Sequence, residues 1–289
     1  MRSFYRSLHV DSNWIRLGYN RRFNKATGKL INISSRSPNL LIIGSQKCGT
    51  TSLFFYLKKH PQIAESTPFK EPGYFIFDNW ARDFWKRTKN IHLRSKQQLK
   101  AHYMSKNLTD QKYFMDASTY YTQFKNESLY DIPQQIYKES PDAKLIFIIR
   151  NPFQRLISVF YHQKRQGNLL DFNACVNHDW HIKTSLFYDR VKPYMQKFGK
   201  DNIWILEMED LQNNPNHVLH NLWSFLEIEP IMIDDIKIHN KTSPANQLKL
   251  NEDTFYKLHP LFAEQMALLN KNFDLSLNWN LDKEKWVNE

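Results

Sequence analysis

The stretch "LIIGSQKCGTTS" at positions 41–52 constrains the fold of this chain more than any other part of its sequence. Its aliphatic half indicates a buried strand, and the small, hydroxyl and basic residues that follow indicate a turn into a helix. Such a unit aims backbone N–H groups at a bound anion. Because Lys47 comes before Gly49, the stretch does not fit the nucleotide-binding pattern G-x-x-x-x-G-K-[ST]. We therefore expect a loop that binds a different kind of phosphorylated ligand.

Short apolar runs alternate with segments of helical periodicity along the rest of the chain. The expected strands are 39–44, 144–150 ("KLIFIIR") and 202–208 ("NIWILEM"). The expected amphipathic helices follow Ser52, begin at Pro152, end at Gly199 and surround 218–226. This alternation is typical of a parallel sheet with helices on its faces. The predicted fold class is α/β, with a central parallel sheet flanked by helices in a single domain, residues 38–289.

Length and composition agree with one such domain. A chain of 289 residues that is 41% hydrophobic can bury a large core. The two cysteines, Cys48 and Cys175, supply neither a disulfide framework nor enough ligands for a structural zinc site, so we expect free thiols and no metal. No run approaches the ~18 unbroken apolar residues of a membrane span, and the first residues lack the apolar part of a signal peptide. These features favour a soluble, cytoplasmic protein.

The charge balance favours an acidic partner. The formal net charge is +11 and the isoelectric point is near 9.4. Nucleotides, anionic polysaccharides, nucleic acids and anionic lipids all fit this description. The aromatic residues, 15% of the chain, are spread along it, and the sequence has no helix-turn-helix or RNA-binding signature. The sequence therefore argues against a nucleic-acid partner.

Residues 1–37 differ from the rest, because they are rich in Arg and Lys and contain one acid, Asp11. We interpret them as a basic N-terminal arm. The arm is either a solvated extension or a segment that makes peripheral contact with an anionic surface, and the sequence leaves both open. The oligomeric state is open as well.

Two of the expected strands are followed by basic residues. Lys47 follows the first strand, close to three hydroxyl residues that begin the next helix. Arg150 ends the second strand, and Ser158 lies about two helical turns further on. Ligands of open α/β sheets bind outside the carboxyl ends of the strands, so both groups can face one crevice. A nucleotide with phosphates at both ends would use both.

Several motifs together resemble the sulfotransferases. "IIGSQKCGTTSLFFYLKKHPQI" is similar to their 5′-phosphosulfate loop, and "LIFIIRNPFQRLISVFYH" to their 3′-phosphate segment, R-[DN]-P-x-x-R-x-x-S-x-[YF]. Further matching elements, in order along the chain, are "KEPGYF", "DASTYY", "SLFYDRVKPYMQKFG" and "ILEMEDLQNNP". The resemblance covers roughly residues 39 to 275. It implies a P-loop-like binding loop for the cofactor.

The resemblance implies transfer of a sulfuryl group from 3′-phosphoadenosine 5′-phosphosulfate (PAPS) to a hydroxyl or amine. This family uses in-line displacement, forms no covalent intermediate and requires no metal, so the protein supplies positioning and charge stabilisation. Lys47 would neutralise charge on the leaving phosphate, and Arg150 with Ser158 would hold the 3′-phosphate. The remaining expected cofactor contacts are Cys48, Gly49, Thr50, Thr51, Ser52, Tyr188 and Lys241.

A base must take the acceptor's proton. In the carbohydrate-directed branch of the family this is a Glu in a Lys-Glu element, which matches Glu71 in "KEPGYF". Lys70 would keep Glu71 ionised or contact the sulfate. The alternative is an ordinary exposed Lys–Glu pair. His60 and His162 are rival bases, although we expect His60 to cap its helix and His162 to support the 3′-phosphate helix from its far end.

The chain departs from the carbohydrate-directed pattern at several positions. Gly73 stands where a His is often found, and the late loop "KIHNKTSPANQLKL" has Lys237 and Lys241 but lacks the usual Arg. Asp116 in "DASTYY" stands where heparan-type members have Lys in K-[ST]-P-x-Y, which predicts a less anionic acceptor than heparan. We expect a carbohydrate, glycoconjugate or glycolipid acceptor, bound in part by the aromatic and basic segment 76–115.

Two other functions remain as alternatives. A P-loop-type nucleotide kinase or NTPase would use the first loop in a similar way, but the chain has no Gly-Lys-[Ser/Thr] arrangement and no convincing metal-binding Asp after an apolar strand. A binding-only module for acidic glycan or nucleic acid would explain the charge but not "KEPGYF".

Overall fold

The computed structural model describes residues 37–66, 70–89, 95–96, 99, 111–123, 131–168, 171–233 and 248–287. The chain divides into two compact units, residues 1–36 and residues 37–289, and all described residues belong to the second. The basic arm predicted at 1–37 therefore lies outside the described residues except for Ser37. The two lysines predicted to close over the cofactor, Lys237 and Lys241, also lie outside them.

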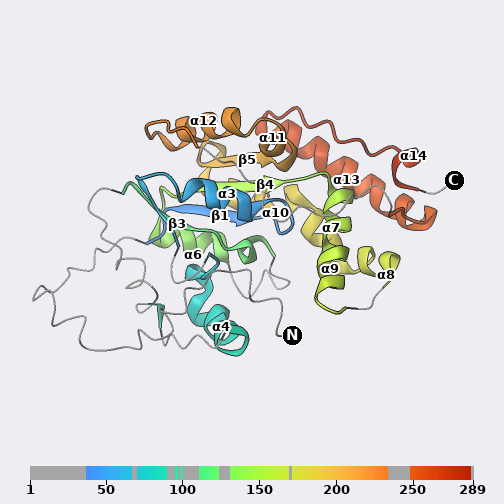
Figure 1. Ribbon diagram of the computed structural model, residues 1–289, viewed down its shortest axis with the longest axis horizontal. Helices are drawn as coiled ribbons and strands as arrows, with labels where there is room; N and C mark the ends of the chain where they lie inside the picture. The colour runs from blue at the N-terminus through green and yellow to red at the C-terminus, as the bar shows by residue number, and fades with distance from the viewer. Residues whose placement is uncertain are drawn as a thin grey trace, which may run out of the picture. The chain divides into compact units, whose positions relative to one another are not determined.

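The strands of the described residues form one parallel sheet with the order β2-β3-β1-β4-β5 (Figure 1). The strands are β1 (Leu40–Gly44), β2 (Ile63–Ala64), β3 (Tyr113–Asp116), β4 (Lys144–Ile149) and β5 (Ile203–Glu207). The ends of β1, β4 and β5 agree with the expected strands to within one residue, and the parallel sheet confirms the α/β fold class. Most of their residues are buried, which is why these strands appear in the sequence as continuous apolar runs.

The strands β2 and β3 are not among the expected ones. They have two and four residues, too few for a clear pattern. Their place is set by pairing, since β3 pairs with β1 and β2 pairs with β3. On the other side of β1 lies β4, which pairs in turn with β5. Because all pairs are parallel, the carboxyl ends of β3, β1 and β4 are neighbours.

Helices surround this sheet, and the expected ones after Ser52, from Pro152, up to Gly199 and around 218–226 are all present. The described helices and helical turns are α3 (Thr50–Leu57), η2 (Tyr74–Ile76), η3 (Phe77–Ala81), α4 (Arg82–Lys89), η4 (Thr119–Thr122), α6 (Ile132–Glu139), α7 (Pro152–Arg165), α8 (Phe172–Val176), α9 (Asp179–Ser185), α10 (Phe187–Phe198), η5 (Lys200–Asn202), α11 (Met208–Asn213), α12 (Pro215–Leu226), α13 (Glu252–Phe273) and α14 (Lys283–Trp286). Asn151 explains the start of α7, because its Oδ1 accepts the N–H groups of Phe153 and Gln154 at 3.1 and 3.3 Å.

One hydrophobic core joins the sheet to its helices and includes buried residues of β1, β4, α10, α12 and α13. The helices α8 and α9 pack against α7 beside the sheet (Figure 1). Both cysteines are buried free thiols, as expected from the sequence. Within the described ranges, no helix combines the length and the apolar composition needed to cross a membrane.

Candidate active site

The phosphosulfate loop, residues 44–52, leads from the end of β1 into α3. Lys47 and Gly49 both have positive φ angles, 70° and 95°. A Cβ atom on Gly49 would lie 3.3 Å from Met208 Cγ and 3.4 Å from Ile148 Cδ1. The left-handed backbone and this close approach both favour glycine. The loop therefore turns tightly against the ends of β4 and β5, with Lys47 at the turn.

Cys48, predicted as a cofactor contact, is directed into the protein. Its side chain is fully buried, and burial raises the pKa of its thiol to about 12. Its backbone N–H donates to the Ser45 carbonyl at 3.2 Å. Its thiol and N–H are thus both engaged within the protein, and the structure gives Cys48 a packing role rather than the predicted one.

The first turn of α3 provides the other predicted contacts, Thr50, Thr51 and Ser52. No side chain caps this helix, because its N-cap is Gly49. The start of a helix carries the positive end of the helix dipole, and its first N–H groups make no bonds within the helix. Thr50 also accepts a hydrogen bond from Lys70 Nζ at 3.3 Å. The start of α3 is therefore suited to an anion such as a phosphate.

Lys47 lies among other cations. Burial, together with the positive charges of Arg165, Arg155 and Arg150, lowers its pKa to about 8. Among the described residues, no carboxylate or other acceptor pairs with its ammonium group. Four like charges near one another are unfavourable unless an anion lies between them. The group is therefore an incomplete site for a ligand with several negative charges.

Arg155 holds the phosphosulfate loop in place, a role that the sequence does not reveal. Its side chain is fully buried, and its Nε donates to the Gln46 carbonyl at 3.0 Å. Its Nη1 donates to the His181 carbonyl and to Ser185 Oγ, at 3.0 and 2.9 Å. Its Nη2 is buried and has no partner among the described residues. Arg155 therefore ties the loop to α9 and keeps one N–H pair for a ligand.

Arg150 and Ser158, the predicted 3′-phosphate contacts, lie at the start and on the first half of α7. Arg150 Nε donates to Gln154 Oε1 at 3.3 Å, and burial lowers its pKa. Ser158 is 4% exposed, and no hydrogen bond to its hydroxyl occurs within the described residues. Both side chains therefore retain the capacity to bind an anion.

One face of α7 lies towards the phosphosulfate loop. Arg155, Ser158, His162 and Arg165 follow one another at spacings of three and four residues, which places them on one side of a helix. Lys47 acts electrostatically on Arg155, His162 and Arg165. Ser158 therefore shares a helix face with the cations that surround Lys47.

His162 lies in the last turn of α7, near the charges of Lys47 and Arg165. Burial, together with the charges of Lys47 and Arg165, lowers its pKa to about 4. Its ring is therefore neutral at pH 7, and so low a pKa makes it a weak proton acceptor. His162 thus lies at the far end of its helix, as expected, and its role as a support of the helix or as a rival base stays a prediction.

His60 is a structural residue. It lies two residues beyond the C-cap Lys58, and its backbone N–H donates to the carbonyl of Leu57, the last residue of α3, at 3.0 Å, while its side chain bonds elsewhere. Its Nδ1 accepts the Gln62 N–H at 3.1 Å, so Nε2 is the protonated nitrogen and donates to the Glu229 carbonyl at 2.8 Å. The ring also packs on Trp223, with centroids 4.8 Å apart. Because both nitrogens are engaged, His60 is not available as a base.

The base segment, residues 70–75, meets the phosphosulfate loop through Lys70. Lys70 Nζ lies 2.7 Å from Glu71 Oε1 and also donates to Thr50. The second carboxylate oxygen, Glu71 Oε2, accepts a hydrogen bond from Thr119 Oγ1 at 3.2 Å. The side chains of Lys70 and Glu71 are 11% and 23% exposed. This is a largely enclosed pair at the start of α3, unlike the exposed surface pair that was the alternative.

Gly73 cannot be replaced by the His that often stands there. Its φ is 64°, and a Cβ atom would lie 2.9 Å from Ala81 Cβ. A side chain at this position would clash with η3. Whatever contact a His makes at this position, this chain does not provide it there.

Asp116 does not line an acceptor cleft, which corrects the sequence interpretation. Its side chain is fully buried at the end of β3, where it accepts hydrogen bonds from Ser118, Tyr121 and the backbone of Tyr74. The prediction of a less anionic acceptor depended on an acidic Asp116 in the cleft. That prediction therefore loses its basis.

The remaining predicted residues are placed less directly. Tyr188 is 8% exposed on α10, three residues after Ser185, and no contact within the described residues joins it to Lys47 or Arg150. Lys241 lies outside the described residues. In segment 76–115, Trp85 is 5% exposed and its Nε1 donates to the Pro72 carbonyl at 3.2 Å, a packing role.

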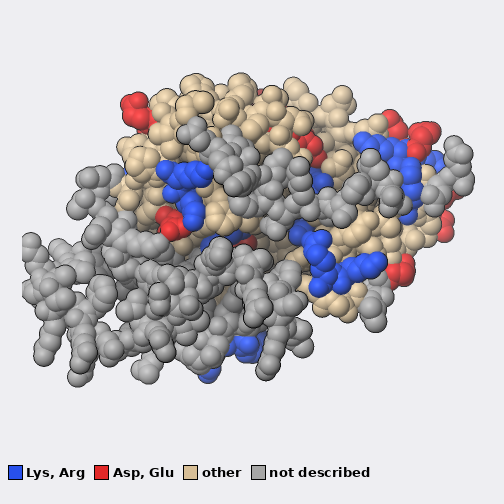
Figure 2. Space-filling model, in the orientation of Figure 1, with Lys and Arg blue, Asp and Glu red and all other residues tan. Residues whose placement is uncertain are grey.

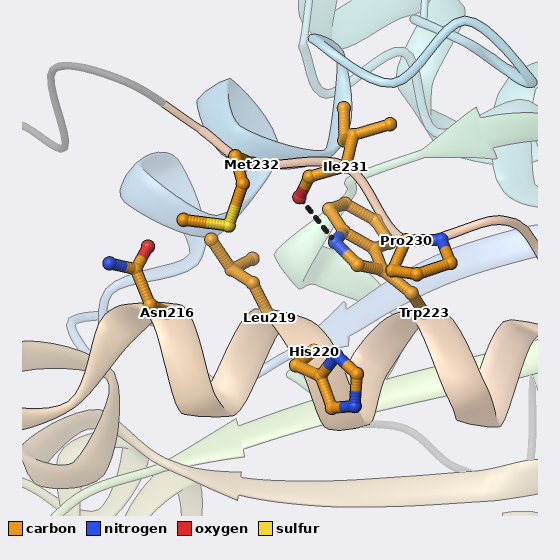
Figure 3. Close-up of a pocket in the computed structure, with 7 residues that line it drawn as sticks. All are labelled: Asn216, Leu219, His220, Trp223, Pro230, Ile231 and Met232. Atoms are coloured by element: carbon orange, nitrogen blue, oxygen red, sulfur yellow. Dashed lines mark hydrogen bonds between the residues drawn. The ribbon is translucent and has the colours of Figure 1, made fainter.

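A separate pocket of about 280 Å³ lies on α12 and the segment after it (Figure 3). Its lining residues are Asn216, Leu219, His220, Trp223, Pro230, Ile231 and Met232. Trp223 Nε1 already donates to the Ile231 carbonyl at 3.2 Å. These described residues include no Lys or Arg, so the pocket does not suit a ligand with two phosphates.

Comparisons with known proteins agree with this site. The sulfotransferase domain model matches residues 37–260. The chain is 24% identical over 255 residues to the bifunctional heparan sulfate N-deacetylase/N-sulfotransferase of Drosophila melanogaster, covering 77% of this chain and 22% of that protein. It is 25% identical over 316 residues to carbohydrate sulfotransferase 15 of Mus musculus, covering 86% of this chain and 54% of that protein. The chain thus spans about a fifth and about half the length of these curated relatives.

A solved structure supports the fold. The crystal structure of a sulfotransferase from Alicyclobacillus acidocaldarius is similar at a TM-score of 0.65 and 23% identity, covering 83% of this chain and 97% of that chain. The family match at 37–260 contains both strand ends that carry basic residues and the base segment between them. On this evidence the chain belongs to the sulfotransferase domain family.

Proposed function

We propose that this enzyme transfers a sulfuryl group from PAPS to a hydroxyl or amine of a carbohydrate or glycoconjugate, with Glu71 as the base. The observation that carries the proposal is the contact of Lys70 with both Glu71 and Thr50, at 2.7 and 3.3 Å. It joins the proton acceptor to the helix start that suits the 5′-phosphate. Proton removal and sulfuryl transfer require such proximity.

The residues of the site fit PAPS. Three features suit an anionic ligand: the unpaired Nη2 of Arg155, the cation group around Lys47 and the uncapped start of α3. Arg150 and Ser158 would hold the 3′-phosphate, which ATP lacks. When bound, PAPS supplies the sulfuryl group and leaves as adenosine 3′,5′-bisphosphate. Lys47 places a positive charge where negative charge grows on the leaving phosphate.

The acceptor class is supported by the relatives, which are named as heparan sulfate and carbohydrate sulfotransferases. Glu71 would take the proton that the acceptor hydroxyl or amine loses as its bond to sulfur forms. Lys70 Nζ pairs with this carboxylate at 2.7 Å. O-sulfation and N-sulfation both fit this arrangement.

The alternative functions have less support. The family match does not favour a nucleotide kinase. On the face drawn in Figure 2, the visible Lys and Arg side chains form separate groups, several of them beside Asp or Glu. A binding-only module for nucleic acid or acidic glycan would be better served by one continuous basic surface.

Two experiments test the proposal. Isothermal titration calorimetry should show that adenosine 3′,5′-bisphosphate binds much more tightly than ATP, and a preference for ATP would contradict it. Radiolabelled PAPS should then be offered with an N-deacetylated heparan oligosaccharide, its N-acetylated form, a neutral oligosaccharide and a glycolipid. Labelling of the deacetylated form alone would indicate N-sulfation. Binding of the bisphosphate without labelling of any carbohydrate would remove the carbohydrate assignment but keep the cofactor.

A further inference from the structure

The segment after β3, residues 116–121, holds the backbone of the base segment at consecutive positions. The backbone N–H groups of three consecutive residues, 73–75, each donate a hydrogen bond to a side chain of segment 116–121. The pairs are Gly73 N–H with Ser118 Oγ at 2.8 Å, Tyr74 N–H with Asp116 Oδ2 at 3.0 Å, and Phe75 N–H with the Tyr121 hydroxyl at 3.3 Å. We call these three hydrogen bonds the clamp. They hold a piece of chain that lacks regular backbone bonding, since residues 71–73 belong to no helix or strand.

Asp116 sets the direction of all three bonds. The hydroxyls of Ser118 and Tyr121 donate to its carboxylate oxygens at 2.5 and 2.6 Å. Because each hydroxyl has one proton and gives it to Asp116, its oxygen is left to accept the backbone N–H. An ionised carboxylate can accept from Ser118, Tyr121 and Tyr74 at once, whereas a protonated one would have to donate one bond itself. One buried carboxylate thus orients the whole clamp.

A negative charge on the buried side chain of Asp116 is energetically unfavourable, which supports a specific role for this residue. Burial raises its pKa to about 6, with the three hydrogen bonds opposing the rise and the nearby Glu71 adding a little to it. No Lys or Arg of the described residues forms a salt bridge with it. A buried carboxylate without a cation is destabilising unless hydrogen bonds compensate for lost water. At pH 7 it is nonetheless ionised and can accept all three bonds.

The same clamp reaches the carboxylate of Glu71. Thr119, between Ser118 and Tyr121 in the chain, donates to Glu71 Oε2 at 3.2 Å. On the other side, Trp85 Nε1 donates to the Pro72 carbonyl. Backbone groups from Pro72 to Phe75 and one oxygen of the base are therefore all fixed. A base misplaced by about 1 Å can lose a factor of about 10² in rate.

We propose that Asp116 is a positioning residue that fixes Glu71 for proton removal through Ser118 and Tyr121. The inference rests on the proposed role of Glu71 as the base. It gives the "DASTYY" element a function in place of the acceptor contact expected from the sequence. Asp116 acts through the base segment alone and contacts neither the acceptor nor the cofactor.

The test compares Tyr121→Phe with Tyr113→Phe. Each removes one buried hydroxyl near β3, but the Tyr113 hydroxyl donates to the Leu226 carbonyl at 2.9 Å, away from the base segment. Tyr121→Phe should lower kcat about 10-fold on the best acceptor of the carbohydrate panel, with unchanged affinity for adenosine 3′,5′-bisphosphate. Hydrogen exchange of residues 70–77 should speed up in the free Tyr121→Phe protein. Tyr113→Phe should change neither.

Asp116→Asn should have a larger effect of the same kind, because its amide nitrogen cannot accept from the donors around it. If Asp116→Asn does not fold, Tyr121→Phe still decides the question. In a Glu71→Gln background, where no base remains to be positioned, Tyr121→Phe should cause no further loss of kcat. An equal loss in both backgrounds, or an unchanged kcat in the single variant, overturns the proposal.

The failure of this proposal differs from a failure of the proposed function. If Glu71→Gln itself turns over like the unmodified enzyme, Glu71 is not the base, and both proposals fall. If Glu71→Gln is slow while Asp116→Asn and Tyr121→Phe are not, only the positioning role is lost. A slow Tyr121→Phe with weakened bisphosphate binding would indicate a general structural role and would also overturn the inference.

Discussion

The two sides of this active site differ in how far their charged groups are paired within the protein. Around the phosphosulfate loop, Lys47 has no anionic partner among the described residues and Arg155 keeps an unpaired Nη2. In the base segment, by contrast, Glu71 is paired with Lys70 and Thr119, and Asp116 accepts three hydrogen bonds. Both sides are largely buried. On the cofactor side, charged groups lack partners among the described residues, whereas on the base side the carboxylates are hydrogen-bonded within the protein.

This difference separates binding from catalysis. Cations that lie near one another repel, so an anionic ligand between them relieves this repulsion and gains affinity. A carboxylate that is already held in place gains nothing from the ligand but lowers the barrier once the acceptor arrives. We therefore expect substitutions on the two sides to change affinity and rate in different proportions.

Lys47→Ala should have the largest effect. Removing a charge that stabilises the leaving phosphate should lower turnover by about 10³-fold, while the melting temperature stays level because no internal partner is lost. Turnover measurements and a melting curve check this, with the exposed Lys138→Ala as control. Activity within a few-fold of the unmodified enzyme would leave Lys47 without a catalytic role.

Glu71→Gln should come next. The amide keeps the size of the side chain but cannot take a proton, so kcat should fall by about 10² or more. Affinity for adenosine 3′,5′-bisphosphate should barely change, as it should in the control Glu264→Gln on the exposed face of α13. Should this variant remain active while His162→Ala is inactive, the base is the histidine beside Lys47.

Arg150→Ala and Ser158→Ala should act on affinity rather than rate. A charge-assisted contact is worth about 1.5 kcal/mol or more, so adenosine 3′,5′-bisphosphate should bind at least about 10-fold more weakly. Adenosine 5′-monophosphate, which has no 3′-phosphate, serves as the matched ligand and should lose little. Equal losses for the two ligands in calorimetry would mean that these residues act through the fold of α7.

The smallest effect should come from pH. The pKa of Lys47 in the free protein is lowered to about 8, so its charged form, which attracts the anion, is lost as pH rises through 8. Affinity for adenosine 3′,5′-bisphosphate should therefore fall a few-fold between pH 7 and pH 9. Lys47→Ala should bind more weakly at pH 7 and show no such fall. A fall of the same size in that variant would assign the titration to another group.

The sequence by itself determined the parts of this protein that local patterns encode. Continuous apolar runs marked β1, β4 and β5, and Pro152 and Gly199 marked helix ends. The parallel topology then placed Lys47 and Arg150 at neighbouring strand ends, because carboxyl ends of parallel strands share one edge. The matched motifs identified the family and its loop.

Tertiary structure alone decided which polar side chains meet. The pattern around Asp116 could not tell a cleft residue from a buried one, because β3 is too short to show which side chains face the core. The local pattern of its helix does not show that Arg155 bonds to Gln46, 109 residues away in the chain. Periodicity reports neighbours within a turn or two of chain. Hydrogen bonds that position a base or a loop join distant segments, and the packing of the sheet brings them together.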